Sequence, residues 1–460
     1  MKRRYSVLIL LVVFALVAAS CGDDSSDTTT TAGETTTTTA ASGGETTTTA
    51  ASGGETTTTA GEMMDIATDV GVDLEAGTIK VGLLADLSGP FAGLVNPIVA
   101  GQEAYWAALN AAGGINGLMV EPITRDTGYE APRHISLYEE LKEEVVAFSQ
   151  STGTPQTLAI NEALQSDGVL AIPLTWYSGW TDPSINANLL HHGVPYCVEA
   201  MNAIEWLSGQ MDIQTMAVAS LGGDYGLDST AGALMAAAEL GIEVVYDGSG
   251  AITGAEALKP VSDAIVASGA DLVFVTATSG TFGPIYQNAI AQGFDAAAWT
   301  GAFVTYSPAY LTSDFAEQFV GDWYGSAYLR PWGADTPGNA AVRDLMTAAG
   351  ATQATSYYGE GVIEAQMIEE ALRIAYDNGD MTQAGVLAAA KSITDLDFGG
   401  LAPNESYAGT PNEQLQRVSI IYNTSIENLA AGGDGIVMIE DSYVGTLAEN
   451  FDFQQACYQL

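Results

Sequence analysis

The chain has 460 residues, 47% of them hydrophobic and 15% charged, so it is long enough for more than one compact unit and most of it can bury a core. Its formal net charge is −43, from 56 acidic and 13 basic residues. Such a surface repels nucleic acid and anionic membranes, because both need basic side chains to replace bound counterions, and we exclude binding to nucleic acid.

Residues 1–21 have the pattern of an export signal that ends in a lipid-attachment cysteine. A basic start, KRR, precedes an apolar run at 7–18 that is too short to favour a membrane-spanning helix. Small residues then lead to Cys21, and AASC is similar to the lipobox of bacterial lipoproteins, although Ala18 stands where leucine is usual. We predict lipidation of Cys21 and a location on the outer face of the cell membrane. The alternative is ordinary cleavage that leaves a free thiol.

Residues 22–62 repeat the sequence TTTTAASGGE with small variations. This segment has almost no bulky apolar side chains, so burial cannot offset the entropy lost on ordering it. We predict a disordered tether, open to glycosylation on its threonines. A tether between a lipid and a folded body indicates a protein that reaches across a cell envelope.

The cysteines and histidines form no metal-binding pattern. None of the 3 cysteines lies in a CxxC motif or a Cys/His cluster. No metal and no cofactor are therefore expected. If Cys21 carries lipid, Cys197 and Cys457 remain as a pair, and outside the cytoplasm two cysteines usually form a disulfide. We predict that they do; the alternative is two buried free thiols.

From Thr78 onward, short apolar runs that end in Gly/Ser turns alternate with segments of helical periodicity, which predicts strands and helices in turn. The first series of predicted strands covers residues 78–89, 118–128, 145–151 and 169–175, with helices at 96–114, 135–145 and 155–168. A second series has strands at 216–226, 242–250, 271–280 and 297–305, with helices at 228–241, 257–269 and 284–293. A helix at 361–379 and short strands at 416–423 and 435–441 follow. Two similar βα series predict an α/β fold with two doubly wound lobes of parallel sheet.

In such sheets, ligands lie outside the carboxyl ends of the strands. The turns at these ends carry hydroxyls, glycines and aromatic rings, at 88–91, 151–155, 175–177, 223–226, 278–280 and 301–303. Glycines and helix N-termini offer backbone N–H groups to an oxygen, and aromatic rings close over an apolar body. Each turn alone is explained by the turn preferences of Gly, Ser and Asp. Their common edge favours a binding site.

Motifs of catalysis are missing from the sequence. It contains no GxSxG elbow, HExxH, Walker loop or GxGxxG. Adjacent acidic residues such as Glu139 and Glu140 point in different directions from a helix, so they cannot act together on a substrate. We therefore expect that the protein is not an enzyme.

Several stretches of the body form a specific combination in chain order: IKVGLLADLSGPFAG, GQEAYWAALNAAGGINGLMVEPITRDTG, STGTPQTLAI, DGVLAIPLT and GGDYG. With them the chain resembles type I periplasmic solute-binding proteins of ABC importers, in the branched-chain amino acid (leucine/isoleucine/valine) family that also contains amide and urea binders. The resemblance covers roughly residues 78–397.

The resemblance implies two doubly wound parallel-sheet lobes joined by a three-strand hinge, which closes on a ligand. We assign the segments as follows: 78–200 and 326–398 to lobe 1, 201–325 to lobe 2, and 399–460 to the completion of lobe 2 and a C-terminal tail. The hinge crossings are placed near residues 197–205, 323–329 and 399. The implied function is to capture a small polar solute, a branched-chain amino acid or an amide- or urea-like compound, and to deliver it to a membrane permease.

Family roles transfer to the positions that match the motifs. Thr154, in the GTP turn, falls where a hydroxyl and an amide hold the ligand's carboxylate or carbonyl. Thr175 and Tyr177 fall where the chain meets the ligand's polar head. Tyr225, in GGDYG, matches an aromatic contact from the second lobe, and Phe91 lines the same cleft.

One position departs from the amino acid binders. In the amino acid binders, an acidic residue that pairs with the ligand's ammonium follows the strand that reads AWTGAFV here. This chain has Ala302 or Phe303 at that position. A buried ammonium without a partner is costly. Either Glu360 or Asp224 substitutes, or the ligand is not an α-amino acid.

Other roles stay open on the sequence alone. The same lobes could form a ligand-sensing receptor lipoprotein. An envelope hydrolase of amides or sugars would need a nucleophile or paired acids, and a structural surface lipoprotein would bind no solute at all.

Overall fold

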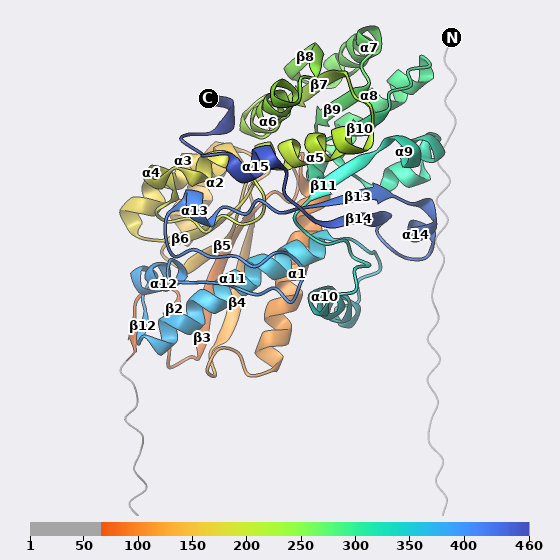
Figure 1. The fold of residues 1–460 in the computed structure, drawn as a ribbon. Coiled ribbons are helices and arrows are strands. Elements are labelled where there is room, and N and C mark those ends of the chain that lie inside the picture. The colour runs from red at the N-terminus through yellow and green to blue at the C-terminus, as the bar shows by residue number, and fades with distance from the viewer. Residues whose placement is uncertain (1–65, 460) are drawn as a thin grey trace, which may run out of the picture. The chain divides into compact units, whose positions relative to one another are not determined.

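The computed structural model describes residues 66–459. The predicted signal, Cys21 and the tether lie outside these residues, so their assignment stays a prediction. Within the described part, the alternating strands and helices build two parallel sheets with the same spatial order of strands, which Figure 1 shows in orange to yellow and in green to teal. The predicted α/β class with two doubly wound lobes is confirmed.

The first sheet consists, in spatial order, of the parallel strands β4 (Met119–Asp126), β3 (Thr78–Ala85), β5 (Ala147–Thr152) and β6 (Leu170–Leu174). Short β2 (Val72–Asp73) pairs antiparallel with the start of β3. Every residue of β5 and β6 is buried, as expected for parallel strands covered on both faces.

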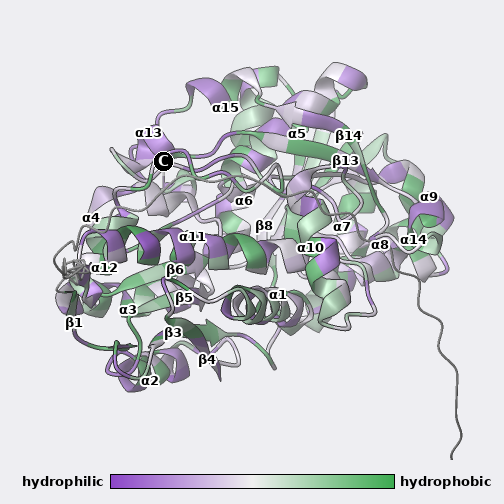
Figure 2. Ribbon diagram, turned by 90° about the horizontal axis from the view of Figure 1, so that it is seen from below, coloured by the Kyte–Doolittle hydropathy of each residue, from purple (hydrophilic) through white to green (hydrophobic). Residues whose placement is uncertain are grey.

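Helices from distant parts of the chain cover this sheet. They are α1 (Ala92–Ala111), α2 (Ala131–Leu141), α3 (Thr154–Asp167), α10 (Pro337–Ala348), α11 (Tyr357–Asp377) and α12 (Gln383–Ala390). The long α11 packs along α1, although most of the second sheet lies between them in sequence. Outer helices such as α2 and α11 mix hydrophilic and hydrophobic colours in Figure 2, as amphipathic helices do. Beside them, β1 (Ala67–Thr68) pairs with β12 (Asp380–Met381).

The second sheet consists of the parallel strands β8 (Glu243–Ile252), β7 (Thr215–Leu221), β9 (Leu272–Thr276) and β10 (Ala298–Thr300). A bridge between Trp299 and Trp323 leads on to three antiparallel strands, β11 (Tyr324–Ala327), β13 (Ser419–Thr424) and β14 (Ile436–Tyr443). The helices of this part are α5 (Tyr196–Gln210), α6 (Asp224–Leu240), α7 (Leu258–Ser268), α8 (Ser279–Ala291) and α9 (Ala316–Asp322). Short helices α4 (Pro183–Asn186), α13 (Pro411–Gln414), α14 (Ile426–Ala430) and α15 (Thr446–Asn450) lie in the loops.

The chain passes between the two sheets before α5, after β11 and before β13. Residues 197–205, predicted as the first crossing, lie inside helix α5, because Pro195 ends the extended segment and apolar residues at helical spacing follow it. The crossings contact one another: Arg330 N donates to Leu401 O (2.9 Å), and Gly193 N donates to Glu405 Oε1 (2.9 Å). The residue boundaries of the two lobes stay a prediction.

The predicted strands and helices of both series are present, with ends shifted by a few residues. The helix α5 was not predicted. Among the helices at 66–459, none is both long and apolar enough to cross a membrane.

Candidate ligand-binding cleft

Turns at the carboxyl ends of strands from both sheets meet around one cleft. Phe91 follows β3, Thr154 follows β5 and Thr175 follows β6, while Tyr225 follows β7 and Val304 follows β10. All of these residues line a single cavity, which we call the inner pocket. The position is the one that parallel sheets provide for ligands, outside the carboxyl edge.

The inner pocket combines aromatic walls with a hydroxyl-bearing floor. Its volume is about 30 Å³, because the rings of both lobes occupy most of the space. Phe91 lies 4.7 Å from Tyr129 and 6.1 Å from Tyr225, and Tyr225 lies 4.9 Å from Tyr196, measured between ring centroids. Trp176 closes the pocket from the turn after β6.

The floor of the inner pocket is the start of helix α3. The Thr154 and Thr175 hydroxyl oxygens lie 2.5 Å apart. Residues at the start of a helix have backbone N–H groups with no partner inside the helix, and these attract an anionic or carbonyl oxygen. Gly153 precedes the helix with φ of 98°, and a Cβ there would lie 2.6 Å from a ring carbon of Tyr129 and collide with the Gln156 side chain. Only glycine fits this turn.

A larger cavity of about 570 Å³, the outer cleft, adjoins the inner pocket. The two share Phe91, Leu94 and Val304. The outer cleft is lined by Pro90, Pro97 and Pro308, by hydroxyls such as Ser279 and Ser307, and by the segments 352–355 and 432–433. No residue that lines either cavity is charged, although the chain carries 56 acidic and 13 basic residues.

Glu199 is a buried acid beside the inner pocket, and the sequence did not indicate it. With Trp176, Tyr196 and Phe303 it lines a small third cavity, and one of its carboxylate oxygens accepts a hydrogen bond from Phe303 N (2.7 Å). Burial raises the pKa of Glu199 well above its usual range. The predicted site residue Phe303 therefore lies next to an acid contributed by helix α5.

Of the predicted site residues, Phe91, Thr154, Thr175 and Tyr225 meet in the inner pocket, and Phe303 lines the adjoining third cavity. Their contact with a ligand stays a prediction.

Tyr177 and Glu360 line none of these three cavities of the described chain. The Tyr177 ring packs against Trp180 and Tyr458. Glu360 is fully buried, pairs with His192 Nε2 (2.5 Å) and accepts from the Tyr328 hydroxyl, so it joins two of the crossing segments. Asp224, the other candidate acid, accepts from the Tyr458 hydroxyl (2.7 Å).

Two groups of side chains could offer ligand atoms to a metal. In one, Cys197 and Cys457 are joined to each other. In the other, His192 and Glu360 bind each other and Glu364 accepts from Gln102 (2.7 Å). The disulfide occupies both cysteines, while His192 Nδ1 and Glu364 Oε1 are buried without a hydrogen-bond partner among residues 66–459, so the expectation of no metal stays a prediction.

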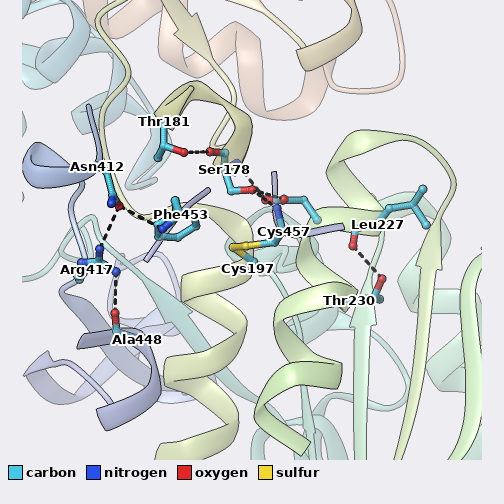
Figure 3. The surroundings of a disulfide bond; sticks show 11 residues. Ser178, Thr181, Cys197, Leu227, Thr230, Asn412, Arg417, Ala448, Phe453 and Cys457 are labelled. Carbon is cyan, nitrogen blue, oxygen red and sulfur yellow. Dashed lines mark hydrogen bonds between the residues drawn. A yellow bond between two sulfur atoms is a disulfide. The ribbon is translucent and has the colours of Figure 1, made fainter. Parts of the chain in front are cut away.

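A disulfide between Cys197 and Cys457 ties the carboxyl end of the chain to helix α5 (Figure 3). Cys457 N donates to Ser178 Oγ (2.8 Å), and Ser178 in turn donates to Asp228 of α6 from its backbone N (3.1 Å) and from its hydroxyl. Burial raises the pKa of Asp228 to about 7. The C-terminal residues therefore contact both the turn after β6 and the second sheet's helices.

The chain is similar to known proteins in both sequence and fold. A family model described as "Periplasmic binding protein" matches residues 78–424. Among curated proteins, no relative matches the chain.

Solved structures share the architecture at low identity. A "Fatty acid ABC transporter substrate-binding protein" from Thermomonospora curvata has 24% identity and a TM-score of 0.76, over 84% of this chain and 97% of that one. A branched-chain amino acid ABC transporter protein from Thermus thermophilus, with bound valine, has 19% identity and a TM-score of 0.69, over 81% and 98%. A solute-binding protein from Rhodopseudomonas palustris, in complex with p-hydroxybenzoic acid, has 18% identity and a TM-score of 0.67, over 80% and 97%.

Proposed function

The chain belongs to the periplasmic binding protein family, and from this premise we propose that it is the extracytoplasmic substrate-binding protein of an ABC importer. The two lobes close on a small solute and present it to a membrane permease, without chemical conversion. The role is supported by solved structures with this fold, among them an ABC transporter substrate-binding protein and an ABC transporter protein with bound valine. A lipid on Cys21 holds the protein at the membrane.

The ligand that the cleft suits best is a small organic carboxylate with an apolar body. The observation that carries this choice is the uncharged lining of the inner pocket, with Thr154 at the start of α3 and Thr175 in the turn after β6. Hydroxyls and helix N–H groups bind a carboxylate without a basic side chain. The aromatic walls then cover an apolar body. The proteins named for fatty acids and bound to p-hydroxybenzoic acid carry ligands of this class.

Titration calorimetry tests the proposal on the purified protein with octanoate, 4-hydroxybenzoate, valine, leucine and urea. We expect saturable binding of the carboxylates and no turnover. In Thr154→Val the loss of one donor to a charged group weakens binding about ten-fold or more. Thr347→Val, on the exposed face of α10, is the matched control and leaves binding unchanged. If no ligand of the panel binds to cooperatively folded protein, the substrate-binding role is wrong. Steady consumption of a ligand would instead indicate the envelope hydrolase.

A branched-chain amino acid is the second candidate, and Glu199 is the observation that favours it. Its carboxyl group lies beside Phe303, next to the position where amino acid binders carry their acid. Because burial raises the pKa of Glu199 and so favours its protonated form, an arriving ammonium would have to displace that proton. This proposal predicts release of about one proton on valine binding, seen as a buffer-dependent binding enthalpy.

The variant Glu199→Gln separates the two candidates. It should weaken valine binding at least ten-fold and abolish proton release. Octanoate binding should stay the same, because octanoate has no ammonium group that would pair with Glu199. Equal effects on valine and octanoate would show that Glu199 only positions Phe303.

A further inference from the structure

We infer that the ligand is an elongated monocarboxylate, with its head group in the inner pocket and its apolar body passing between Phe91 and Val304 into the outer cleft. The inference rests on the proposed function and names the ligand class of the same site. It assigns the outer cleft as the part of the site that selects chain length.

The inner pocket and the outer cleft share three lining residues and differ greatly in volume. Phe91, Leu94 and Val304 line both. The inner pocket of about 30 Å³ has room for a group of roughly one water molecule's volume. The outer cleft of about 570 Å³ has the size of a typical small-molecule site. A ligand headed by a carboxylate at Thr154 therefore finds space for its body only toward the outer cleft.

The chemistry of the outer cleft fits an uncharged, mainly apolar body. Pro90, Phe91, Leu94, Val304 and Pro308 form apolar surface near the neck between the cavities. The rest of the lining mixes hydroxyl and amide groups, such as Ser279, Thr352 and Gln353, with small apolar residues, and it tolerates both water and the end of a chain. No charged residue lines it, so a second carboxylate or an ammonium at the far end of a ligand would be left without a partner.

Each lobe contributes one side of the neck. Phe91 contacts Tyr129 from the first sheet's turns and lies 6.1 Å from Tyr225 of the second, so its ring stands where the lobes meet. Val304 follows β10 and is buried. A ligand chain that passes between Phe91 and Val304 contacts both lobes and therefore stabilises their closed state. A compact ligand in the inner pocket leaves the outer cleft filled with solvent.

The test measures affinity for straight-chain monocarboxylates of increasing length, from acetate to dodecanoate, by titration calorimetry on the whole protein. Each methylene that enters the cleft should tighten binding by up to about four-fold, until the cleft is filled and the affinity levels off. Dicarboxylates of the same length should bind at least ten-fold more weakly than the monocarboxylates, because their second charge has no partner.

Two variants assign the effect to the outer cleft. Ala309→Trp fills the outer cleft from an exposed position that does not line the inner pocket, so it should remove the gain in affinity with chain length. Val304→Phe narrows the neck and should act in the same direction. Ile135→Trp, at a 40% exposed position of α2, is the control and should leave the whole series unchanged.

The outcomes separate the inference from the proposed function. An affinity that is the same from butyrate to dodecanoate, or that stays length-dependent in Ala309→Trp, overturns the elongated ligand and leaves the substrate-binding role in place. Failure of every carboxylate and amino acid to bind overturns both.

Discussion

A buried acidic side chain in the crossing segments makes the stability of the protein depend on pH. Glu405 is buried, and its carboxyl accepts from Gly193 N of another crossing. Burial raises the pKa of Glu405 from its usual 4.5 to about 8. The folded protein therefore keeps a proton on Glu405 that the unfolded chain loses above pH 4.5. The stability that this proton provides is complete below that pH and is lost as the pH rises toward 8.

Glu405→Gln should remove this pH dependence, because the amide keeps an acceptor for Gly193 and carries no charge. We expect the free energy of unfolding of the variant, relative to the wild type, to increase between pH 5 and pH 8.5 by on the order of a few kcal/mol. Urea unfolding at both pH values measures it. The buried His134 and His191, whose pKa values burial lowers to about 4 and about 3, are common to both proteins and cancel in the difference. Exposed Glu162→Gln should show no such change.

At the scale of single elements, the two ends of helix α3 require glycine for different reasons. At Gly153 a side chain would collide with Gln156 and Tyr129 in the inner pocket, and φ is 98°. At Gly168, the C-cap, φ is 72° and nothing lies within 4 Å of an added Cβ. The first glycine shapes the ligand site, whereas the second only ends the helix.

Gly153→Ala and Gly168→Ala therefore form a matched pair. Both should lower the free energy of unfolding by about 1 kcal/mol or more, because alanine is strained at positive φ. Only Gly153→Ala should also weaken ligand binding, by ten-fold or more, since it displaces Tyr129 and the start of α3. Urea unfolding and calorimetry on both variants measure this. Equal loss of binding in the two would mean that α3 acts only through its stability.

The disulfide between Cys197 and Cys457 holds the C-terminal segment to helix α5. The disulfide joins residues separated by 260 positions, so it restricts a long loop of the unfolded chain. We expect Cys197→Ser/Cys457→Ser to lose about 2–5 kcal/mol of unfolding free energy. Reductant should destabilise the wild type by a similar amount and leave the double variant unchanged. A reductant effect that persists in the double variant would contradict this role.

For the whole molecule, the function needs the binding body outside the cytoplasm and near its permease. In the proposed function, the predicted lipid on Cys21 and the tether at 22–62 provide both. Cys21→Ser should move the protein from the membrane fraction to the soluble extracytoplasmic fraction, because a protein tether alone has little affinity for lipid. Ligand affinity should stay the same. Mass spectrometry of the N-terminal peptide checks the lipid directly.

The sequence by itself determined the class of fold and the edge at which a ligand site forms. Strand and helix periodicity is local, and two βα series imply parallel sheets whose carboxyl ends face one way. Phe91, Thr154, Thr175 and Tyr225 each lie at the carboxyl end of a predicted strand or just after it, so their meeting in the inner pocket follows from topology.

Only the tertiary structure decided which other side chains reach the cleft and which do not. Glu199 lies within helix α5, away from any strand end, and accepts a hydrogen bond from Phe303 N in the turn after β10. Glu360 is also a buried glutamate, but its carboxylate is hydrogen-bonded to His192 and Tyr328 in the crossing segments. The outer cleft brings together segments from 90 to 433. Such contacts depend on the packing of two lobes across long sequence separations, and local periodicity carries no information about that packing.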